Sequence, residues 1–513
     1  MKALGRSGLA GEAPARIING KNNMLRDGIM AKKQNKGNAK MLWQGRLEAT
    51  PEEIVFNYMS AENIALDAAL VEHDIKGSMA HAVMLHEKGL LSLHEAKAIL
   101  SGLEVVLADY KKGDFALERK LEDVHMNVEA KLTEIDAHGK KLHTARSRND
   151  QINLDMRMYM RAEIITLLKK LHALGVSLEG LSKQSVPMPA YTHTRVAQPI
   201  SVSYWANSYF DGFFRDAVRL SRAYDMLNTN PLGSGAVAGT TLPIDRGLTA
   251  KLLGFASVQE NSLDCSSNRG EFEAQVAFVC SLIMTRLSRM CEELIWQSQK
   301  GLVALPDKFC TGSSMMPQKK NADILELVRG RSARAYASLS HILVAMKGVP
   351  SGYNSDLQET KYAVMQSIST AQDSLEIMSQ VVPSLKFDKA KMLEEIEQGY
   401  ACATELADLL VKQGVPFRDA HAKVGGIVKH CIEKKVYLSQ LTAEQVELAT
   451  EVLLDKKELA AALSPDKSKR YDMAVSQKKL EEIRKMAQGR EKMLLESDRL
   501  LWQQVQRITS SRA

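Results

Sequence analysis

Two arginines and an asparagine in the first third of the chain have the types and spacing needed to bind a carboxylate. Residues 140–151 read KKLHTARSRNDQ, with Arg146 and Arg148 on either side of a serine and Asn149 directly after them. A planar guanidinium offers paired donors that match the two oxygens of a carboxylate, so this array is suited to capturing one. On its own, the segment is more ordinarily interpreted as the solvated, charged start of a helix.

A second polar stretch holds a histidine close to a proline. Residues 191–199 read YTHTRVAQP, and the Thr192–His193 pair near Pro199 predicts a fixed loop that presents an imidazole. An imidazole can gain or lose a proton near neutral pH, which makes it a candidate acid or base. A lone histidine is nevertheless more often structural than catalytic.

A third stretch combines hydroxyl, ammonium and amide groups in one loop. Residues 312–321 read GSSMMPQKKN and precede an expected helix, which is an arrangement that binds anions. The spacing is not that of a Walker phosphate loop. The residue types alone do not decide whether Ser313 or Ser314 would be the reactive hydroxyl.

Long helices are the elements that must position these three stretches. The chain has no proline between residues 51 and 187, 199 and 231, 243 and 306, 317 and 350, or 350 and 383, and a proline inside a helix costs about 3 kcal/mol or more. Steps of three and four predict an apolar seam along each of two helices, formed by Val276, Cys280, Ile283, Leu287, Met290 and Leu294 and by Leu325, Val328, Ser332, Ala335, Leu339, Ile342 and Met346. No long alternating pattern typical of strands is present. We therefore predict an all-α fold dominated by a central bundle of long helices.

Four parts of the chain are expected. Residues 1–40 are predicted to be a disordered basic leader, 41–150 an N-terminal helical domain, 151–390 the central bundle domain and 391–513 a small helical domain rich in Lys and Glu. The apolar seams favour oligomerisation through the bundle, although they could also pack within one chain.

Composition excludes several classes of protein. A chain of 513 residues that is 45% apolar and 25% charged is typical of a globular protein with a large core. Six scattered cysteines without a CxxC pair argue against a zinc site and a disulfide framework, and favour reduced thiols in the cytoplasm. No apolar run approaches the roughly 18–20 residues of a membrane span. Residues 1–40 hold nine Lys or Arg and two acidic residues, which accounts for the whole net charge of +7, so neither a membrane nor a nucleic acid is an expected partner.

Five motifs, in order along the chain, resemble those of a known family of lyases. Residues 312–321 are similar to the signature GSSxMPxKxN of the fumarase/aspartase superfamily. The resemblance narrows to the argininosuccinate lyase family through residues 141–151 (KLHTARSRNDQ), 231–236 (PLGSGA), 261–264 (NSLD) and 353–359 (YNSDLQE). It extends from residues 42–46 to residues 414–418 and beyond, so it covers nearly everything except the leader.

This resemblance implies the reversible β-elimination of argininosuccinate, a small-molecule substrate, to arginine and fumarate, without a metal or an organic cofactor. It also implies a three-domain fumarase/aspartase-like fold and a homotetramer with a multi-helix core. Each active site of such a tetramer draws residues from three subunits, which would explain why the polar stretches lie so far apart in the sequence.

The family match also assigns roles to residues of this sequence. Ser313 is the implied catalytic base, while Lys319 and Asn321 hold the carboxylate that becomes doubly negative in the intermediate. His193 is implied to assist at the leaving-group side, with Glu326 as the carboxylate paired with it. The other implied substrate-binding residues are Arg148, Asn149, Thr192, Tyr353, Gln358, Lys361, Asp67 and Arg269. His125 also matches a family motif and is expected to be structural or to support the site from behind.

Four residues depart from the usual family pattern. Ala145 and Ala322 stand where Gly and Pro are usual, and they are expected to alter only the stiffness of loops. Asn63 stands where the family has a substrate-contacting Ser, and Gly270 stands where it has Asp. Both are expected at the rim of the amino-acid-binding pocket, so they bear on the amine leaving group. Two alternatives therefore stay open: a related fumarate-forming carbon–nitrogen lyase acting on another N-substituted aspartate or an aminopolycarboxylate, and a non-catalytic structural homologue.

Overall fold

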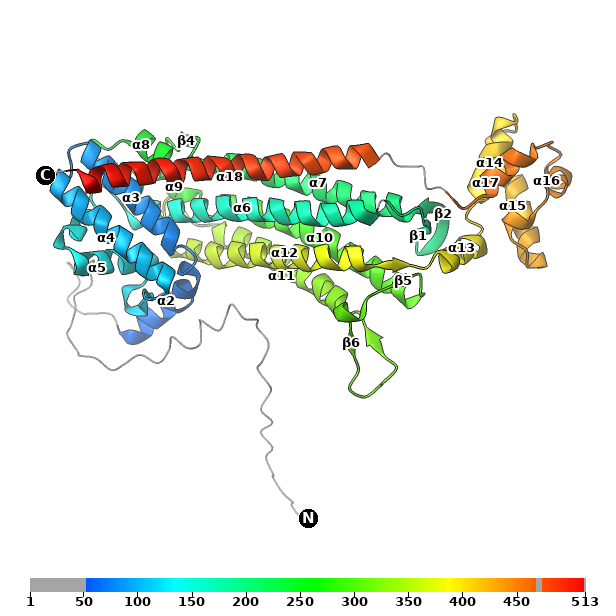
Figure 1. Cartoon of the computed structure of the whole chain (residues 1–513), viewed down its shortest axis with the longest axis horizontal. Helices are drawn as coiled ribbons and strands as arrows, with labels where there is room; N and C mark the ends of the chain where they lie inside the picture. Colours follow the sequence, from blue (N-terminus) through cyan, green and yellow to red (C-terminus); the bar gives the residue numbers. More distant parts are fainter. Residues whose placement is uncertain (1–51, 182, 467–472, 512–513) are drawn as a thin grey trace, which may run out of the picture.

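Long helices lying side by side form the body of the molecule (Figure 1). The structure is a computed structural model and describes residues 52–181, 183–466 and 473–511. The predicted leader, residues 1–40, and the motif at residues 42–46 lie outside the described residues.

Six long helices of the described chain make the bundle, and their bounds are α6 (Arg148–Leu181), α7 (Val202–Leu227), α10 (Glu271–Gln299), α11 (Asp323–Met346), α12 (Glu359–Val381) and α18 (Met473–Ser510). Helix α6 has 34 residues, which corresponds to a length of about 51 Å at 1.5 Å per residue. It packs against α7, α12 and α18, while α10 packs against α7, α11 and α12. The predicted all-α bundle is confirmed.

The two predicted apolar seams lie against each other inside one chain. All six seam residues of α10 are fully buried, and α11 is the helix that α10 contacts most extensively. Ser281 Oγ donates a hydrogen bond to the carbonyl of Ala335 at 3.1 Å, so the small residues in the middle of the second seam let the two backbones approach closely. The interpretation of these seams as an oligomer surface was therefore wrong, because they are used within the monomer.

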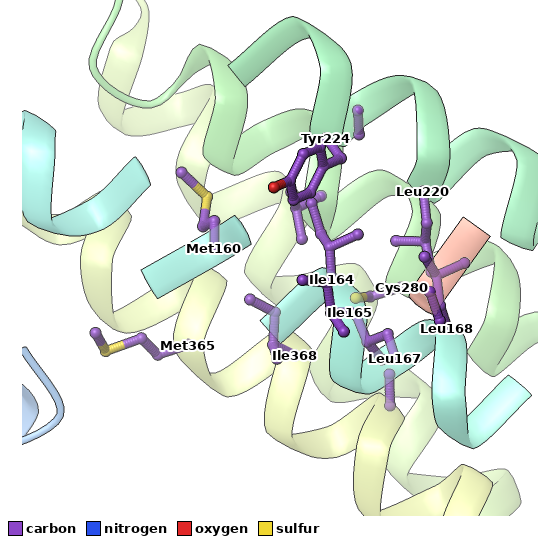
Figure 2. Close-up of a cluster of buried hydrophobic side chains, with 14 of the residues drawn as sticks. Met160, Ile164, Ile165, Leu167, Leu168, Leu220, Tyr224, Cys280, Met365 and Ile368 are labelled. Carbon is purple, nitrogen blue, oxygen red and sulfur yellow. The ribbon is translucent and has the colours of Figure 1, made fainter. Parts of the chain in front are cut away.

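Figure 2 shows part of the core, where side chains from α6, α7, α10 and α12 meet. Ile164, Leu168, Leu220, Tyr224 and Ile368 are each no more than 1% exposed. Burying one such side chain stabilises the fold by about 1.5–3 kcal/mol. A continuous cluster of this kind holds the long helices as a rigid frame for the groups at their ends.

The N-terminal part is a set of shorter helices, α2 (Glu53–Asp67), α3 (Val71–Glu87), α4 (Leu93–Lys112) and α5 (Val124–Ile135), with 3-10 turns η2 (Arg119–Leu121) and η3 (Ala137–Lys141). Helix α4 begins with a reciprocal capping box between Ser92 and Glu95 and ends at Gly113, which has a φ of 83°. Such caps satisfy the backbone groups that a helix end leaves unpaired.

Four two-stranded ladders connect the helices. They pair β1 (Pro187–Thr192) with β2 (Arg195–Ser201), β3 (Thr229–Asn230) with β4 (Ser257–Val258), β5 (Val303–Ala304) with β8 (Lys386–Phe387), and β6 (Thr311–Gly312) with β7 (Lys320–Asn321). The short helices between them are α8 (Arg246–Leu252), α9 (Ser262–Ser267), η4 (Asp307–Phe309), η5 (Ser355–Gln358) and η6 (Val382–Ser384). Residues 191–199, predicted as a loop, are instead the end of β1, the turn and most of β2.

The last part of the chain divides in two. Helices α13 (Lys389–Gln398), α14 (Ala403–Lys412), α15 (Phe417–Lys434), α16 (Ala443–Thr450) and α17 (Lys456–Leu463) follow the bundle, with η7 (Leu438–Gln440) among them. Buried side chains between residues 402 and 463 form a separate core. Helix α18 instead returns along α6 and α7, and its Ile483, Leu501 and Val505 belong to the main core. The predicted single domain over residues 391–513 is corrected accordingly.

None of the helices in the described ranges combines the length and apolar character needed to cross a bilayer. The six cysteines are free thiols in the structure, and five of them are buried.

Candidate active site

A pocket lies at one end of the bundle, where α2 approaches the first turns of α6 and α12. Five separate parts of the sequence line it, contributing Met59, Asn63, Asp67, Glu122, Asp123, His125, Arg148, Asn149, Ile152, Arg269, Tyr353, Ser355, Gln358 and Lys361. The structure thus brings together seven of the nine predicted substrate-binding residues, leaving out Thr192 and Asn321.

Helix ends hold the charged side chains of this pocket. Asp67 ends α2, Arg148 begins α6 and Arg269 lies just before α10. Asp123 is the N-cap of α5, where its carboxylate accepts a hydrogen bond from the amide of Met126 at 2.9 Å. Because the ends of packed helices carry these groups, their positions are set before any ligand binds.

Opposite charges are paired inside the pocket. The Lys361 ammonium forms a buried ion pair with Asp67, and burial lowers the pKa of Lys361 in spite of that carboxylate. The Arg148 guanidinium contacts the carboxylates of Glu122 at 3.0 Å and Asp123 at 2.9 Å. A ligand that carries both positive and negative groups can exchange partners with these pairs without leaving a charge unpaired, so the pocket suits a zwitterionic ligand.

One wall of the pocket is a row of hydrogen-bonded polar side chains. Asn63 donates to Gln358 at 2.8 Å, and Gln358 donates to the Tyr353 hydroxyl at the same distance. The Arg269 guanidinium lies 5.4 Å from the centroid of the Tyr353 ring, a cation–π distance. Arg269 is only 5% exposed, and its Nε has no hydrogen-bond partner among the described residues.

A buried Asp–His–Asp cluster involving one lining residue supports this pocket. His125 Nδ1 lies 2.7 Å from Asp74 Oδ1 and 3.6 Å from Asp155 Oδ2. Burial opposes a charge on the ring, but the carboxylates of Asp74, Asp123 and Asp155 outweigh it and raise the pKa of His125 to about 9. The ligand atoms of this trio lie within 4.8 Å of one another. The short Nδ1–Oδ1 contact, however, fits a hydrogen-bonded ion pair. Sequence reasoning noted His125 but missed both aspartates.

Replacing His125 with glutamine should destabilise the protein more at about pH 6 than at about pH 9.5. The native pKa of about 9 exceeds the roughly 6.5 of an unfolded histidine. The stabilising contribution is therefore fully present below about pH 6.5 and is lost as the pH rises through about 9. Between the two pH values, the difference in unfolding free energy between wild type and variant should shrink by on the order of 3 kcal/mol. Denaturant unfolding at one fixed protein concentration measures it; a constant difference would contradict a charged native imidazole.

His193 sits at the tip of the β1–β2 hairpin. Thr192 pairs with Arg195, so His193 and Thr194 are the two turn residues. Both have positive φ angles, 52° and 61°, as a tight two-residue hairpin of the primed type requires. A non-glycine residue in this region costs of order 1 kcal/mol or more, so the turn holds two unfavourable conformers while presenting an exposed imidazole.

Ser313 is distinguished from Ser314 by its backbone surroundings. The amides of Met315 and Met316 donate hydrogen bonds to Ser313 Oγ at 3.3 and 3.0 Å. Hydrogen bonds donated to an oxygen stabilise its negatively charged form, so they favour a Ser313 alkoxide. No hydrogen bond of this kind reaches Ser314 from the described residues, so the two adjacent hydroxyls differ in their surroundings.

The two lysines of the same hairpin also differ. Lys320 Nζ donates to the carbonyl of Leu305 and to the carboxylate of Asp307, both at 2.6 Å, and so ties β7 to the chain before β6. The Lys319 side chain is exposed and makes no ion pair or hydrogen bond with any described residue. Lys319 is therefore the ammonium that remains available to a ligand.

Within one chain, the predicted site residues form three separate groups. The pocket lies at the start of α6, while the His193 turn follows its end, about 51 Å further along the helix axis. The Ser313 hairpin precedes α11, whose 24 residues span about 36 Å before Tyr353 is reached. Figure 1 shows the β1–β2 hairpin at one end of the bundle, α2 at the other and the β6 hairpin projecting from the side. Glu326 is exposed in the first turn of α11, and no ion pair joins it to His193 among the described residues.

The departures from the family pattern have different structural consequences. Asn63 lines the pocket, as predicted. Gly270 does not line it; it has a φ of 100°, and a Cβ there would lie 2.7 Å from Met346, so its role is to shape the backbone before α10. Ala145 adopts a φ of 61°, which explains why glycine is usual at this position. Ala322 is the N-cap residue of α11 and caps it without a side-chain hydrogen bond.

The chain is similar to known proteins over most of its length. A family model described as "Lyase" matches residues 53–336, and one described as "Argininosuccinate lyase C-terminal" matches residues 400–470. The chain is 44% identical over 418 residues to an argininosuccinate lyase of Syntrophotalea carbinolica, covering 80% of this chain and 90% of that protein. It is also 44% identical over 409 residues to the argininosuccinate lyase of Moorella thermoacetica, which covers 79% of this chain and 88% of that protein. Among solved structures, EDDS lyase in complex with formate is similar, with a TM-score of 0.77 and 26% identity over 90% of this chain and 97% of that chain.

Proposed function

The chain belongs to the argininosuccinate lyase family, whose members convert argininosuccinate reversibly to arginine and fumarate, and we propose which of its residues carry out each step. The chain is a carbon–nitrogen lyase, so its residues must remove a proton from carbon, stabilise the resulting negative charge and release a nitrogen leaving group. The observation that carries the proposal is the Ser313 hydroxyl with its two amide donors.

Ser313 is the proposed base. Its Oγ takes the proton from the carbon next to a succinyl carboxylate, and the electron pair left behind is delocalised into that carboxylate, which becomes doubly negative. An ordinary serine hydroxyl is a poor base, so the two amide donors and a nearby ammonium are needed to favour the alkoxide. The electron pair then forms the carbon–carbon double bond of fumarate as the carbon–nitrogen bond breaks.

Lys319 and Asn321 are the proposed donors to the doubly negative carboxylate. Replacing Lys319 with methionine should therefore lower kcat by about 10²–10³, the loss typical of one donor in a charge-stabilising site. Lys320→Met is the matched control, because Lys320 is already bound to Asp307, and it should retain most of the activity. Steady-state kinetics of fumarate formation measures kcat for both variants. Equal losses of kcat would contradict the different roles proposed for Lys319 and Lys320.

His193 is proposed to pass a proton to the departing guanidino nitrogen, and Glu326 of another subunit to orient its ring. The strained turn holds the imidazole at the tip of a hairpin, where another copy of the chain can reach it. Glu326 is exposed and free of ion pairs within the described chain, which leaves it available for such a contact.

The pocket at the end of α6 is proposed to hold the zwitterionic remainder of the substrate. Its paired charges, Arg148 with Glu122 and Asp123 and Lys361 with Asp67, fit a molecule that carries carboxylate, ammonium and guanidinium groups. Asn149 and Tyr353 add neutral donors to the same pocket, and Thr192 joins it from the neighbouring turn in the assembled enzyme.

We further propose a cytoplasmic homotetramer that serves arginine biosynthesis. Helices α10, α11 and α12 carry large exposed apolar side chains: Phe278, Leu327, Tyr336, Leu343, Val344 and Tyr362. Exposed apolar surface of this extent is typical of subunit interfaces. Association through these faces would bring the three groups of site residues together from different copies.

The direct test is to incubate the full chain with argininosuccinate and follow the absorbance of fumarate. Fumarate formation is expected, and none from folded, assembled protein would overturn the proposal. EDDS in place of argininosuccinate tests the related-lyase alternative, which has less support because identity to the EDDS lyase is 26% against 44% to the argininosuccinate lyases. The non-catalytic alternative is disfavoured because Ser313, His193, Lys319 and Glu326 are all present.

A further inference from the structure

The polar wall of the pocket has a defined hydrogen-bond direction. Asn63 Nδ2 donates to the carbonyl of Met59 at 3.0 Å and to Gln358 Oε1 at 2.8 Å. Gln358 Nε2 in turn donates to the Tyr353 hydroxyl oxygen at 2.8 Å. Four residues from two distant parts of the sequence therefore form one continuous row.

The direction of this row is set at its first member. A backbone carbonyl can only accept, so Asn63 must turn its amide nitrogen toward Met59. The second hydrogen of that nitrogen meets Gln358, which must therefore present its oxygen to Asn63 and its nitrogen to Tyr353. The Tyr353 oxygen is thus used as an acceptor, and its own hydrogen remains available for another partner.

A cation also lies over the ring of Tyr353. The Arg269 guanidinium is 5.4 Å from the Tyr353 ring centroid, is buried and has an unpartnered Nε. Tyr353, Gln358 and Arg269 all line the same pocket. A hydroxyl donor and a buried guanidinium in one pocket suit the oxygens of a carboxylate.

We propose that Asn63 is a positioning residue that fixes the direction of this row, so that Tyr353 donates its hydroxyl hydrogen to a carboxylate of the bound substrate. A serine, the residue usual here in the family, has one hydrogen and cannot donate to both Met59 and Gln358. Asn63 therefore gives this chain a more rigid orientation of Gln358. The inference rests on the proposed function, because it takes the substrate to occupy this pocket.

The test is a double-mutant cycle between position 63 and Tyr353. Asn63→Leu keeps the approximate size of the side chain, adds no charge and removes both donors, so the Gln358 amide can turn and accept the Tyr353 hydrogen. KM for argininosuccinate should rise about tenfold with little change in kcat, as expected for one lost hydrogen bond to a charged group. Tyr353→Phe should raise KM by a similar factor, and Asn63→Leu should add nothing in the Tyr353→Phe background.

The outcomes separate the inference from the function on which it rests. The role of Asn63 would be overturned if the two substitutions raised KM by independent factors, so that their free-energy effects added. It would also be overturned if Asn63→Leu had the wild-type KM while Tyr353→Phe had a raised one. Neither result would contradict the proposed function. A normal KM for Tyr353→Phe would overturn the proposed hydrogen bond from Tyr353 to the substrate, whereas no fumarate from the folded wild type would overturn the function itself. Asn63→Ala, which also adds no charge and removes both donors, replaces Asn63→Leu if the latter does not fold, and the same non-additivity with Tyr353→Phe is expected.

Discussion

Replacing Ser313 with alanine should reduce turnover of argininosuccinate by at least about 10³-fold, within the range by which a positioned general base accelerates proton transfer. The substitution removes the only atom proposed to take the proton, while the hairpin backbone that surrounds it can stay in place. KM should change much less than kcat, because the pocket that holds the rest of the substrate lies elsewhere in the chain. Steady-state kinetics of fumarate formation measures both constants.

Ser314→Ala is the matched control for this experiment. It removes the same chemical group from the adjacent residue of an exposed loop, but Ser314 receives no amide hydrogen bond like those from Met315 and Met316 to Ser313. Activity within a few-fold of wild type is expected. If Ser314→Ala were inactive and Ser313→Ala active, the assignment of the base would be reversed.

The long helices could be predicted from the sequence because proline and hydrophobic periodicity are local signals. The seam at Val276, Cys280 and Ile283 is fully buried, as the spacing indicated. What the spacing could not tell was the partner of that seam. It packs on α11 of the same chain. An apolar stripe on a helix predicts that this face is buried, but it does not predict which other surface buries it.

The β1–β2 hairpin was missed for a different reason. Pro187, Pro189 and Pro199 lie in its strands, and proline weakens any strand prediction. The turn itself uses His193 and Thr194 where Asn and Gly are the usual residues. The sequence therefore lacks the local signals of a hairpin, and the two strands are recognised only from the hydrogen bonds between them.

Helix α18 was assigned to the wrong domain because its composition resembles that of the small domain. Its Lys and Glu residues face outward, while Ile483, Leu501 and Val505 are buried against the main bundle.

The buried Asp–His–Asp cluster that supports the pocket was missed because its members are far apart in the sequence. Asp74 and Asp155 lie 51 and 30 positions from His125. Contacts between distant segments leave no mark in a single sequence.

Co-expression of two inactive variants should restore activity if each active site is shared between subunits. Ser313→Ala damages the β6–β7 hairpin group, and His193→Gln damages the β1–β2 turn group. In randomly mixed tetramers whose sites take these groups from different chains, about one site in four receives both intact. Activity of about a quarter of the wild-type value is therefore expected, measured on mixed tetramers purified through two different tags.

Ser313→Ala mixed with Lys319→Met is the control, because both substitutions lie in one hairpin. A site that receives Ser313 from the second variant also receives the defective residue 319, so activity should not exceed that of the better single variant. Recovery in the first mixture but not in the second would separate shared sites from a general effect of mixing. The lengths of α6 and α11, about 51 and 36 Å, keep the three groups apart in one chain. If verified mixed tetramers stayed inactive in both cases, the proposed sharing would fail.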